Sequence, residues 1–144
     1  MTQIDFYILQ EKGNALLGRF ACRLVDKAWQ RGLRCHINVE TQEQAAQIDD
    51  MLWTFRDISF LPHATSDAAP QEAQRLAAII GIGTEPAVDA EVLINLRPDV
   101  PDFFSRFERV AELVSNEEQK RAAGRDRFRF YRDRGYPLES HNIR

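Results

Sequence analysis

The residues of this 144-residue chain best suited to chemistry are arginines and aromatic residues near its C-terminus. Between Arg121 and Tyr136 the sequence reads RAAGRDRFRFYRDRGY. On a helix with 3.6 residues per turn, one side of this segment carries Arg121, Arg125, Phe128, Arg129 and Arg132. Guanidinium groups donate paired hydrogen bonds to carboxylates or phosphates, and an adjacent ring offers an apolar surface. This side of the helix is therefore predicted to bind an anionic ligand.

Charge is unevenly distributed along the chain. Residues 120–144 contain eight Lys or Arg against three acids, which gives a local net charge of +5. Because the whole chain carries −3, residues 1–119 carry −8. This acidic part would repel a nucleic-acid backbone that extends past the basic segment. A short acidic peptide with a terminal aromatic residue fits better. Single-stranded nucleic acid and a helix that only keeps the protein soluble are the alternatives.

Other motifs that could carry catalysis or nucleotide binding are weak. Gly81-Ile82-Gly83 follows an expected strand, but no third glycine has the dinucleotide-binding spacing, and Pro86 interrupts the place where a helix should begin. On a helix the adjacent carboxylates of Asp49 and Asp50 would point about 100° apart, so they cannot share a proton. The sequence therefore predicts no nucleotide site and no catalytic residue, and an unrecognised nucleotide-dependent enzyme is a distant third hypothesis.

The histidines and cysteines do not suggest a metal centre or a nucleophile. His36 alternates with apolar neighbours in an expected strand, which favours a histidine in the core or on the sheet face, and His63 and His141 lie in loop-like sequence. Cys22 and Cys35 have neither a CxxC spacing nor a nearby histidine pair, so both are predicted to be reduced core thiols. No metal and no cofactor are expected.

The composition is typical of a single globular domain. A chain of this length commonly forms one core, and 44% of its residues are hydrophobic and 28% charged. The N-terminus lacks the basic and apolar regions of a signal peptide. No segment approaches the ~18 consecutive apolar residues that a membrane span needs. We therefore expect a cytoplasmic protein of one domain, residues 1–144.

Hydrophobic spacing near the N-terminus predicts a strand, helix, strand, helix order. Residues 4–9 read as a buried strand, and apolar residues recur at helical spacing over residues 17–28. Residues 33–39 read as a second strand, and the capping sequence at Thr41 opens a second helix. Because parallel neighbours need crossover connections, this order predicts a three-layer α/β/α fold with a mostly parallel, Rossmann-like sheet.

The rest of the chain is expected to add strands and two helices. Residues 76–82 and 91–96 read as strands, and 58–64 as a short edge segment. A third helix is expected, with an apolar stripe of Phe103, Phe107, Val110, Ala111 and Val114. On this helix Glu112 would be solvated. The basic-aromatic helix is expected over about residues 116–134.

Three segments resemble a known family. They are DFYIL from Asp5, DDMLWTFRDISFLPHA from Asp49 and RDRFRFYRDRGYPL from Arg125. In this order along the chain, they resemble the chi subunit of bacterial DNA polymerase III holoenzyme. The resemblance covers nearly the whole chain. It implies a Rossmann-like accessory protein of the clamp loader, involved in DNA replication and without enzymatic activity.

The resemblance also implies two protein partners and no direct contact with nucleic acid or membrane. One partner is the acidic C-terminal tail of single-stranded DNA-binding protein, which ends in an aromatic residue with a free carboxylate. Carried over by motif, its site comprises Val114, Arg121, Arg125, Phe128 and Arg129. Arg125 is expected to bind the terminal carboxylate, and Phe128 stands where the family often has tyrosine. The other partner is the psi subunit, which leads to the clamp loader and whose surface matches Trp53 and Phe60.

Overall fold

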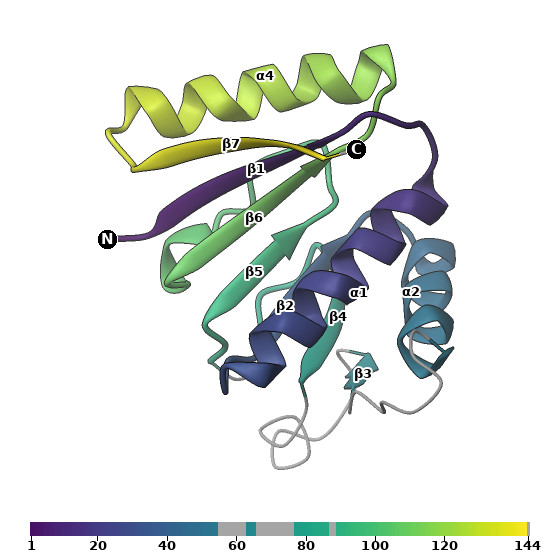
Figure 1. Ribbon diagram of the computed structural model, residues 1–144. Coiled ribbons are helices and arrows are strands. Elements are labelled where there is room, and N and C mark those ends of the chain that lie inside the picture. The colour runs from purple at the N-terminus through teal and green to yellow at the C-terminus, as the bar shows by residue number, and fades with distance from the viewer. Residues whose placement is uncertain (55–62, 66–76, 87–88, 144) are drawn as a thin grey trace.

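The computed structural model describes residues 1–54, 63–65, 77–86 and 89–143, and within these residues strands and helices alternate along the chain (Figure 1). The strands are β1 (Gln3–Leu9), β2 (Cys35–Val39), β3 (His63–Thr65), β4 (Ala78–Ile82), β5 (Val92–Asn95), β6 (Arg109–Val114) and β7 (Leu138–Ile143). The helices are α1 (Asn14–Gln30), α2 (Gln42–Thr54), the short 3-10 helix η1 (Phe104–Arg106) and α4 (Glu118–Asp133).

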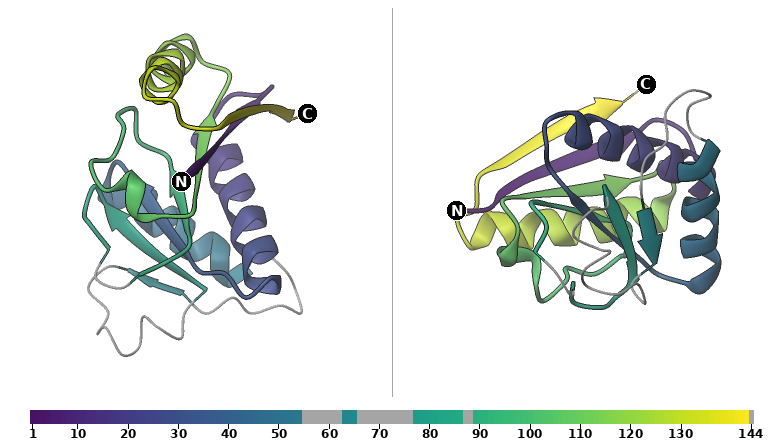
Figure 2. Two further views of the ribbon diagram at one scale, coloured as in Figure 1. Left: turned by 90° about the vertical axis from the view of Figure 1, so that its left-hand side faces the viewer. Right: turned by 90° about the horizontal axis from the view of Figure 1, so that it is seen from below.

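The described strands form one parallel sheet in the order β3-β4-β2-β5-β6-β1-β7. β1 lies inside the sheet between β6 and β7, whereas β3 and β7 form its two edges. Helices α1 and α2 cover one face, and α4 lies over the other (Figure 1, Figure 2). This arrangement confirms the predicted three-layer α/β fold.

The sheet separates two hydrophobic clusters. The cluster on the face of α1 and α2 includes Val25, Ile48 and Ile37. The cluster on the face of α4 includes Phe6 of β1 and Tyr131 of α4. Since interior strands of a parallel sheet bury side chains on both faces, their sequences are nearly continuous apolar runs.

Local signals at the start of α2 and at the end of α1 have the roles that the sequence predicts. The Thr41 hydroxyl oxygen accepts a hydrogen bond from the backbone N–H of Gln44 at 3.1 Å, and the side-chain oxygen of Gln44 accepts one from the N–H of Glu40 at 2.9 Å. These bonds satisfy two donors at the start of α2. At the end of α1, Gly32 has a φ of 75°, a left-handed conformation that favours glycine.

Residues 103–114 do not form the helix that their spacing predicted. Instead, η1 is followed by β6, which lies between β5 and β1 and is buried at every position from Val110 to Val114. A strand buried on both faces has apolar residues at almost any spacing, so periodicity could not distinguish it from a helix. The expectation that Glu112 is solvated was also wrong, because this residue is fully buried.

The C-terminal strand β7 was not among the expected elements. Its sequence LESHNI is polar and mostly exposed, as an edge strand can be, and it pairs in parallel with β1. β4 and β5 confirm the strands expected within 76–82 and 91–96. β3 lies at a sheet edge, and the part of the expected edge segment before it, with Phe60, lies outside the described residues. No helix in the described part of the chain has the length and apolar character needed to cross a membrane.

Candidate functional site

A cavity of about 210 Å³ lies between α4 and the sheet. It is lined by Phe6, Ile8, Val114, Arg121, Gly124, Arg125, Phe128 and Ser140. Even-numbered residues of β1 point towards α4, and odd-numbered residues point to the other face. Of the five residues predicted for the tail site, four line this cavity, whereas Arg129 does not. Val114 was expected on a helix, but it lies on strand β6. It nevertheless lines the cavity, as predicted.

The floor of the cavity is apolar. Val114 is buried, and the half-buried ring of Phe128 meets the ring of Phe6 edge-on, with centroids 5.3 Å apart. At Gly124 a Cβ atom would lie 3.0 Å from Cγ2 of Val114, so the missing side chain lets α4 approach β6 closely. An apolar side chain of a ligand could therefore pack between the helix and the strand ends.

The arginines around the cavity differ in their partners. Arg121 donates a hydrogen bond to the side-chain oxygen of Asn116 at 3.1 Å, and Arg129 forms an ion pair with Asp126. Arg125 is exposed and has no hydrogen-bond or ion-pair partner among the residues that the structure describes. Arg125 is therefore the guanidinium at the cavity whose donors are available to a ligand.

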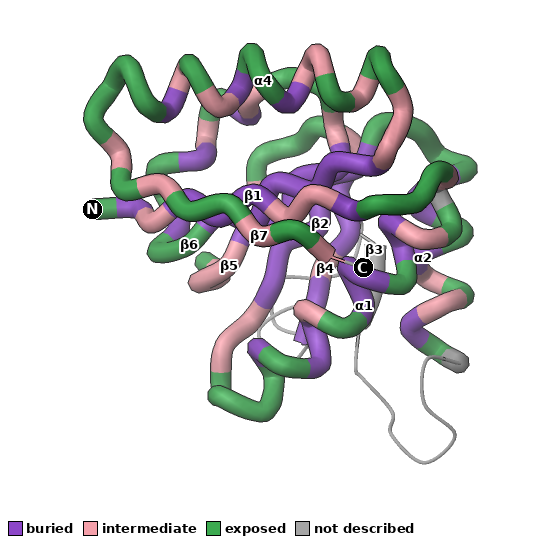
Figure 3. Tube along the Cα trace, turned by 45° about the horizontal axis from the view of Figure 1, so that its top comes forward, coloured by how far each residue is buried: buried purple, intermediate pink, exposed green. Residues whose placement is uncertain are grey.

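A buried polar cluster anchors α4 to β6. The carboxylate of Glu112 accepts hydrogen bonds from Nε of Arg127 at 2.8 Å and from the Tyr131 hydroxyl at 2.7 Å. It also accepts one from the side-chain amide of Asn95 at 2.9 Å. Arg127 donates a further bond to the carbonyl oxygen of Pro98 at 2.9 Å. These directional bonds fix the rotation of α4 about its axis and so determine which arginines face the cavity. Along α4, buried positions alternate with exposed ones (Figure 3).

Burial changes the proton affinity of this cluster. Burial raises the pKa of Glu112, although Arg127 and the hydrogen bonds from Tyr131 and Asn95 oppose this effect. Burial and the neighbouring carboxylate of Glu112 raise the pKa of Tyr131, so its hydroxyl keeps its proton and acts as a donor. This cluster was not predicted from the sequence, because Glu112 was expected to be solvated.

A signal for the inner face of α4 was present in the sequence. Gly124, Arg127 and Tyr131 recur at i, i+3 and i+7, and all three are buried in the structure. Tyr131 confirms the prediction that it packs the helix onto the domain. Phe130 is half-buried, and the guanidinium of Arg134 lies 3.6 Å from the centre of its ring.

The two aromatic residues predicted for the psi surface differ in what the structure describes. Trp53 lies in the last turn of α2 and is 52% exposed. Phe60 lies outside the described residues. The structure therefore describes only one of the two.

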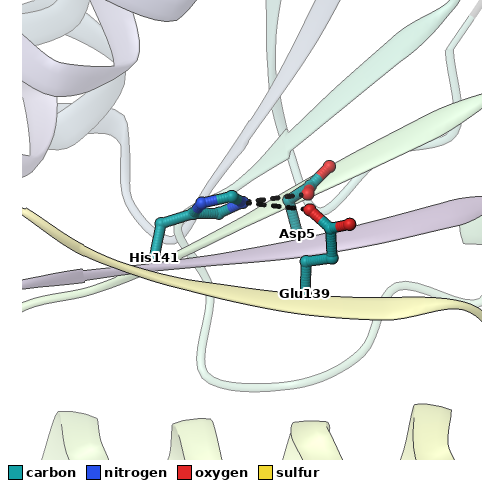
Figure 4. A group of neighbouring side chains, drawn as sticks. All are labelled: Asp5, Glu139 and His141. Atoms are coloured by element: carbon teal, nitrogen blue, oxygen red, sulfur yellow. Dashed lines mark hydrogen bonds and ion pairs between the residues drawn. The ribbon is translucent and has the colours of Figure 1, made fainter.

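A second group of polar side chains lies on the opposite face of the sheet from the cavity. Asp5 of β1 meets Glu139 and His141 of β7 there (Figure 4). Nε2 of His141 lies 3.1 Å from Oδ1 of Asp5 and 3.8 Å from Oε2 of Glu139. This group was not predicted from the sequence, because β7 was not expected and His141 was placed in loop-like sequence.

The remaining histidine and cysteine side chains described are buried. Cys22 and Cys35 are free thiols in the core, as predicted, and burial raises the pKa of each to about 12. Burial lowers the pKa of His36 to about 4. A hydrogen bond between its Nε2 and the carbonyl oxygen of Thr84 favours the charged form and opposes this decrease. His36 is thus the sheet-face histidine that the sequence indicated, and the thiols are poor nucleophiles.

Comparisons with known proteins agree on one family. A family model described as the DNA polymerase III chi subunit, HolC, matches residues 1–139. The DNA polymerase III subunit chi of Pseudomonas aeruginosa is 38% identical over 143 residues, which cover 99% of this chain and 98% of that protein. The subunits of the same name from Haemophilus influenzae and Escherichia coli are 30% and 26% identical, over 96% and 97% of this chain and equal shares of their own length.

Solved structures with very different sequences share the fold. The crystal structure of T4 UvsW matches with a TM-score of 0.71 and 10% identity, over 99% of this chain and 41% of that one. The C-terminal domain of a Sulfolobus solfataricus SWI2/SNF2 ATPase matches with a TM-score of 0.57 and 9% identity, over 92% of this chain and 87% of that one. At such low identity the likeness concerns the α/β architecture alone.

Proposed function

Because this chain belongs to the DNA polymerase III chi subunit family, we propose that the cavity between α4 and the sheet binds the acidic C-terminal tail of single-stranded DNA-binding protein. In this role the chain is a non-catalytic accessory subunit of the replication machinery. It connects the protein that coats single-stranded DNA with the clamp loader, through psi where psi is present.

The observation that carries this proposal is the position of Arg125. Its guanidinium stands at an apolar cavity and is unpaired within the described residues, while Arg121 and Arg129 already have polar neighbours. A carboxylate accepts two parallel hydrogen bonds from a guanidinium fork, and such charge-assisted bonds are stronger than neutral ones. A free terminal carboxylate next to an aromatic side chain would satisfy both parts of the site.

The proposed binding mode assigns each part of the ligand to a part of the cavity. The terminal carboxylate pairs with Arg125, and the terminal aromatic ring packs against Phe128 and Val114. Phe128 offers a ring face but no hydroxyl, so contact with it is apolar. Acidic residues further along the tail lie near Arg121 and the other exposed arginines of α4, where their contribution is electrostatic.

We also propose that Trp53 belongs to the surface that binds the psi subunit. It is a large, apolar side chain with half of its surface exposed. Aromatic side chains of this kind often dominate the free energy of protein association. Replacement of Trp53 by Ala is expected to abolish co-purification with psi and to leave tail binding unchanged. Retained co-purification would contradict this assignment.

To test the main proposal, a fluorescent acidic peptide that ends in Phe is titrated with the full chain. Binding is measured by fluorescence anisotropy. A matched peptide without the terminal Phe keeps the acidic residues but removes the ring. We expect saturable binding of the first peptide and a large loss with the second. Equal binding of the two peptides would exclude the cavity as the site. Tighter binding to a single-stranded oligonucleotide than to either peptide would favour the competing hypothesis of direct nucleic-acid binding.

A further inference from the structure

We propose that Asp5, Glu139 and His141 form a binding site for one divalent transition-metal ion, of which Zn²⁺ is the best match. The three side chains lie on the sheet face opposite the α4 cavity, and Figure 4 shows them converging on one another away from α4. The proposal is independent of the tail-binding function, because it uses no residue of the cavity.

The strand register brings the three side chains together. β1 and β7 are adjacent parallel strands, in which Asp5 is the partner of Glu139 and Tyr7 is the partner of His141. Side chains two residues apart on a strand point to the same face, so Glu139 and His141 flank Asp5 on one surface. Hydrogen-bonded strands hold these backbone positions more rigidly than a loop would.

The spacing of the donor atoms fits a small metal ion. Nε2 of His141 lies 3.1 Å from Oδ1 of Asp5 and 3.8 Å from Oε2 of Glu139, and all three donor atoms lie within 4.8 Å of one another. In a tetrahedral zinc site with bonds of about 2.0–2.2 Å, ligand atoms are roughly 3.3–3.6 Å apart. The two distances from Nε2 of His141 therefore lie within a few tenths of an ångström of this range, and side-chain rotation of the exposed Glu139 would bring its carboxylate to the same ion.

Neighbouring side chains orient two of the three ligands. Arg109 donates a hydrogen bond to Oδ2 of Asp5 at 2.8 Å, which leaves Oδ1 directed at His141. The imidazole of His141 stacks on the ring of Tyr7, with centroids 4.9 Å apart and planes inclined by 18°. Such outer contacts fix ligand geometry in known metal sites.

Exposure and charge are compatible with an ion that enters from solvent. The side chain of Asp5 is 4% exposed, whereas those of His141 and Glu139 are 37% and 66% exposed. Two carboxylates face the ion, and the guanidinium of Arg109 offsets one of their charges. Imidazole with carboxylate oxygens is a ligand set that zinc accepts. The Nε2 lone pair binds the ion, so the ring adopts the tautomer with a proton on Nδ1. A fourth position stays open to water.

An ion at this site would link the C-terminal strand β7 to its neighbour β1 and so to the rest of the sheet. β7 is an edge strand with few buried side chains, and it pairs only with β1 among the described strands. A ligand that binds the folded state but not the unfolded state raises the free energy of unfolding by RT ln(1 + [L]/Kd). The inferred role of the ion is thus structural, and a water molecule at the fourth position can exchange with solvent.

The experiment uses the full chain after treatment with a chelator. Titration with Co²⁺ is followed by visible absorption, because four-coordinate Co²⁺ has strong bands that hexaaqua Co²⁺ lacks, and Zn²⁺ is titrated by calorimetry. We expect one equivalent of either ion to bind, displacement of Co²⁺ by Zn²⁺, and a rise of several degrees in melting temperature with excess Zn²⁺. Absence of saturable binding, with the three side chains held by an ion pair only, would overturn the proposal.

Variants locate the ion. His141→Phe keeps a ring against Tyr7 but removes the nitrogen ligand, and Glu139→Gln removes one carboxylate at an exposed position. Each is expected to weaken Zn²⁺ binding by more than about tenfold. Glu43→Gln makes the same charge change at the start of α2, far from the site, and should bind Zn²⁺ like the parent chain. Equal affinity of Glu139→Gln and Glu43→Gln would rule out this site even if His141→Phe failed to fold.

Discussion

At the scale of single residues, the arginines of α4 have different roles despite their similar chemistry. Arg127 is buried in an ion pair with Glu112, Arg129 is paired with Asp126 on the surface, and Arg125 faces the cavity without a described partner. Arg127 lies two residues from both Arg125 and Arg129, so it points to the opposite, inner face of α4. Arg125 and Arg129 share a side of the helix, and they differ because Asp126 pairs with Arg129. Only the arginine without a described partner has its full set of donors available to a ligand.

Replacement of Arg125 by Ala is expected to weaken binding of the acidic peptide by about 1.5–3 kcal/mol, the usual range for a hydrogen bond to a charged group. Arg132→Ala is the matched control, since Arg132 is exposed on the same helix and does not line the cavity. Anisotropy titrations of both variants make the comparison. An unchanged affinity for Arg125→Ala, or equal losses in both variants, would contradict the assigned role of Arg125.

The stability of the protein should depend on pH through His36. Burial lowers the pKa of His36 to about 4, whereas the unfolded chain takes up this proton near the ordinary value of 6.5. Between these two values the unfolded state binds more protons than the folded state, so the free energy of unfolding falls as the pH falls. The expected loss from this residue is at most about 3 kcal/mol.

Urea unfolding at several pH values between about 7 and 4 measures this effect. His36→Gln keeps a side-chain amide that can donate to the carbonyl oxygen of Thr84 but does not titrate. The variant should therefore show a shallower fall in unfolding free energy than the parent over this range. Identical pH profiles of parent and variant would show that other groups govern the acid sensitivity.

At the scale of secondary structure, α4 is the element that builds the candidate site, and the Glu112 cluster holds it in place. The helix joins β6 to β7 and crosses over β1, so the cavity forms only where helix and sheet face each other. Replacement of one member of a buried ion pair leaves the other charge uncompensated in a region without water. The cluster is therefore the most sensitive point of this packing.

Arg127→Met is expected to lower the free energy of unfolding by about 3–5 kcal/mol, because it leaves the Glu112 carboxylate buried without its cationic partner. Arg132→Met makes the same chemical change at an exposed position and should cost less than about 0.5 kcal/mol. Chemical denaturation of both variants gives the comparison. The double variant Arg127→Met with Glu112→Leu should recover part of the loss. A near-neutral Arg127→Met would mean that the cluster does not anchor α4.

At the scale of the whole molecule, charge is divided between an acidic body and a basic C-terminal segment. Residues 120–144 carry +5 and the rest −8, and α4 contains six of the eight basic residues of that segment. Screening of exposed charges depends on ionic strength, with a Debye length of about 30 Å at 0.01 M and about 8 Å at 0.15 M. Binding of an acidic partner should therefore respond to salt over this range.

We expect the affinity for the acidic peptide to fall several-fold between these two salt concentrations. A control peptide keeps the terminal Phe and its carboxylate but has Gln in place of its other acidic residues. Its weaker binding should depend less on salt, because it keeps the direct contact with Arg125 but loses the longer-range attraction to the other arginines of α4. Equal salt dependence of the two peptides would show that the basic surface of α4 takes no part in recognition.

The strand and helix order of the first half, the α/β class and the basic-aromatic helix, with Arg121, Arg125 and Phe128 on one side, could be predicted from the residues alone. Those features depend on local spacing and capping, which periodicity reports directly. Contacts in the folded protein were needed to establish that residues 109–114 form a strand, that Glu112 is buried with Arg127, and that β7 pairs with β1. These outcomes depend on neighbours distant in sequence: a strand inside a parallel sheet shows no alternation, and an edge strand needs few apolar residues. For the same reason, the sequence does not reveal that Asp5, Glu139 and His141 lie together. Their proximity depends on the register between β1 and β7.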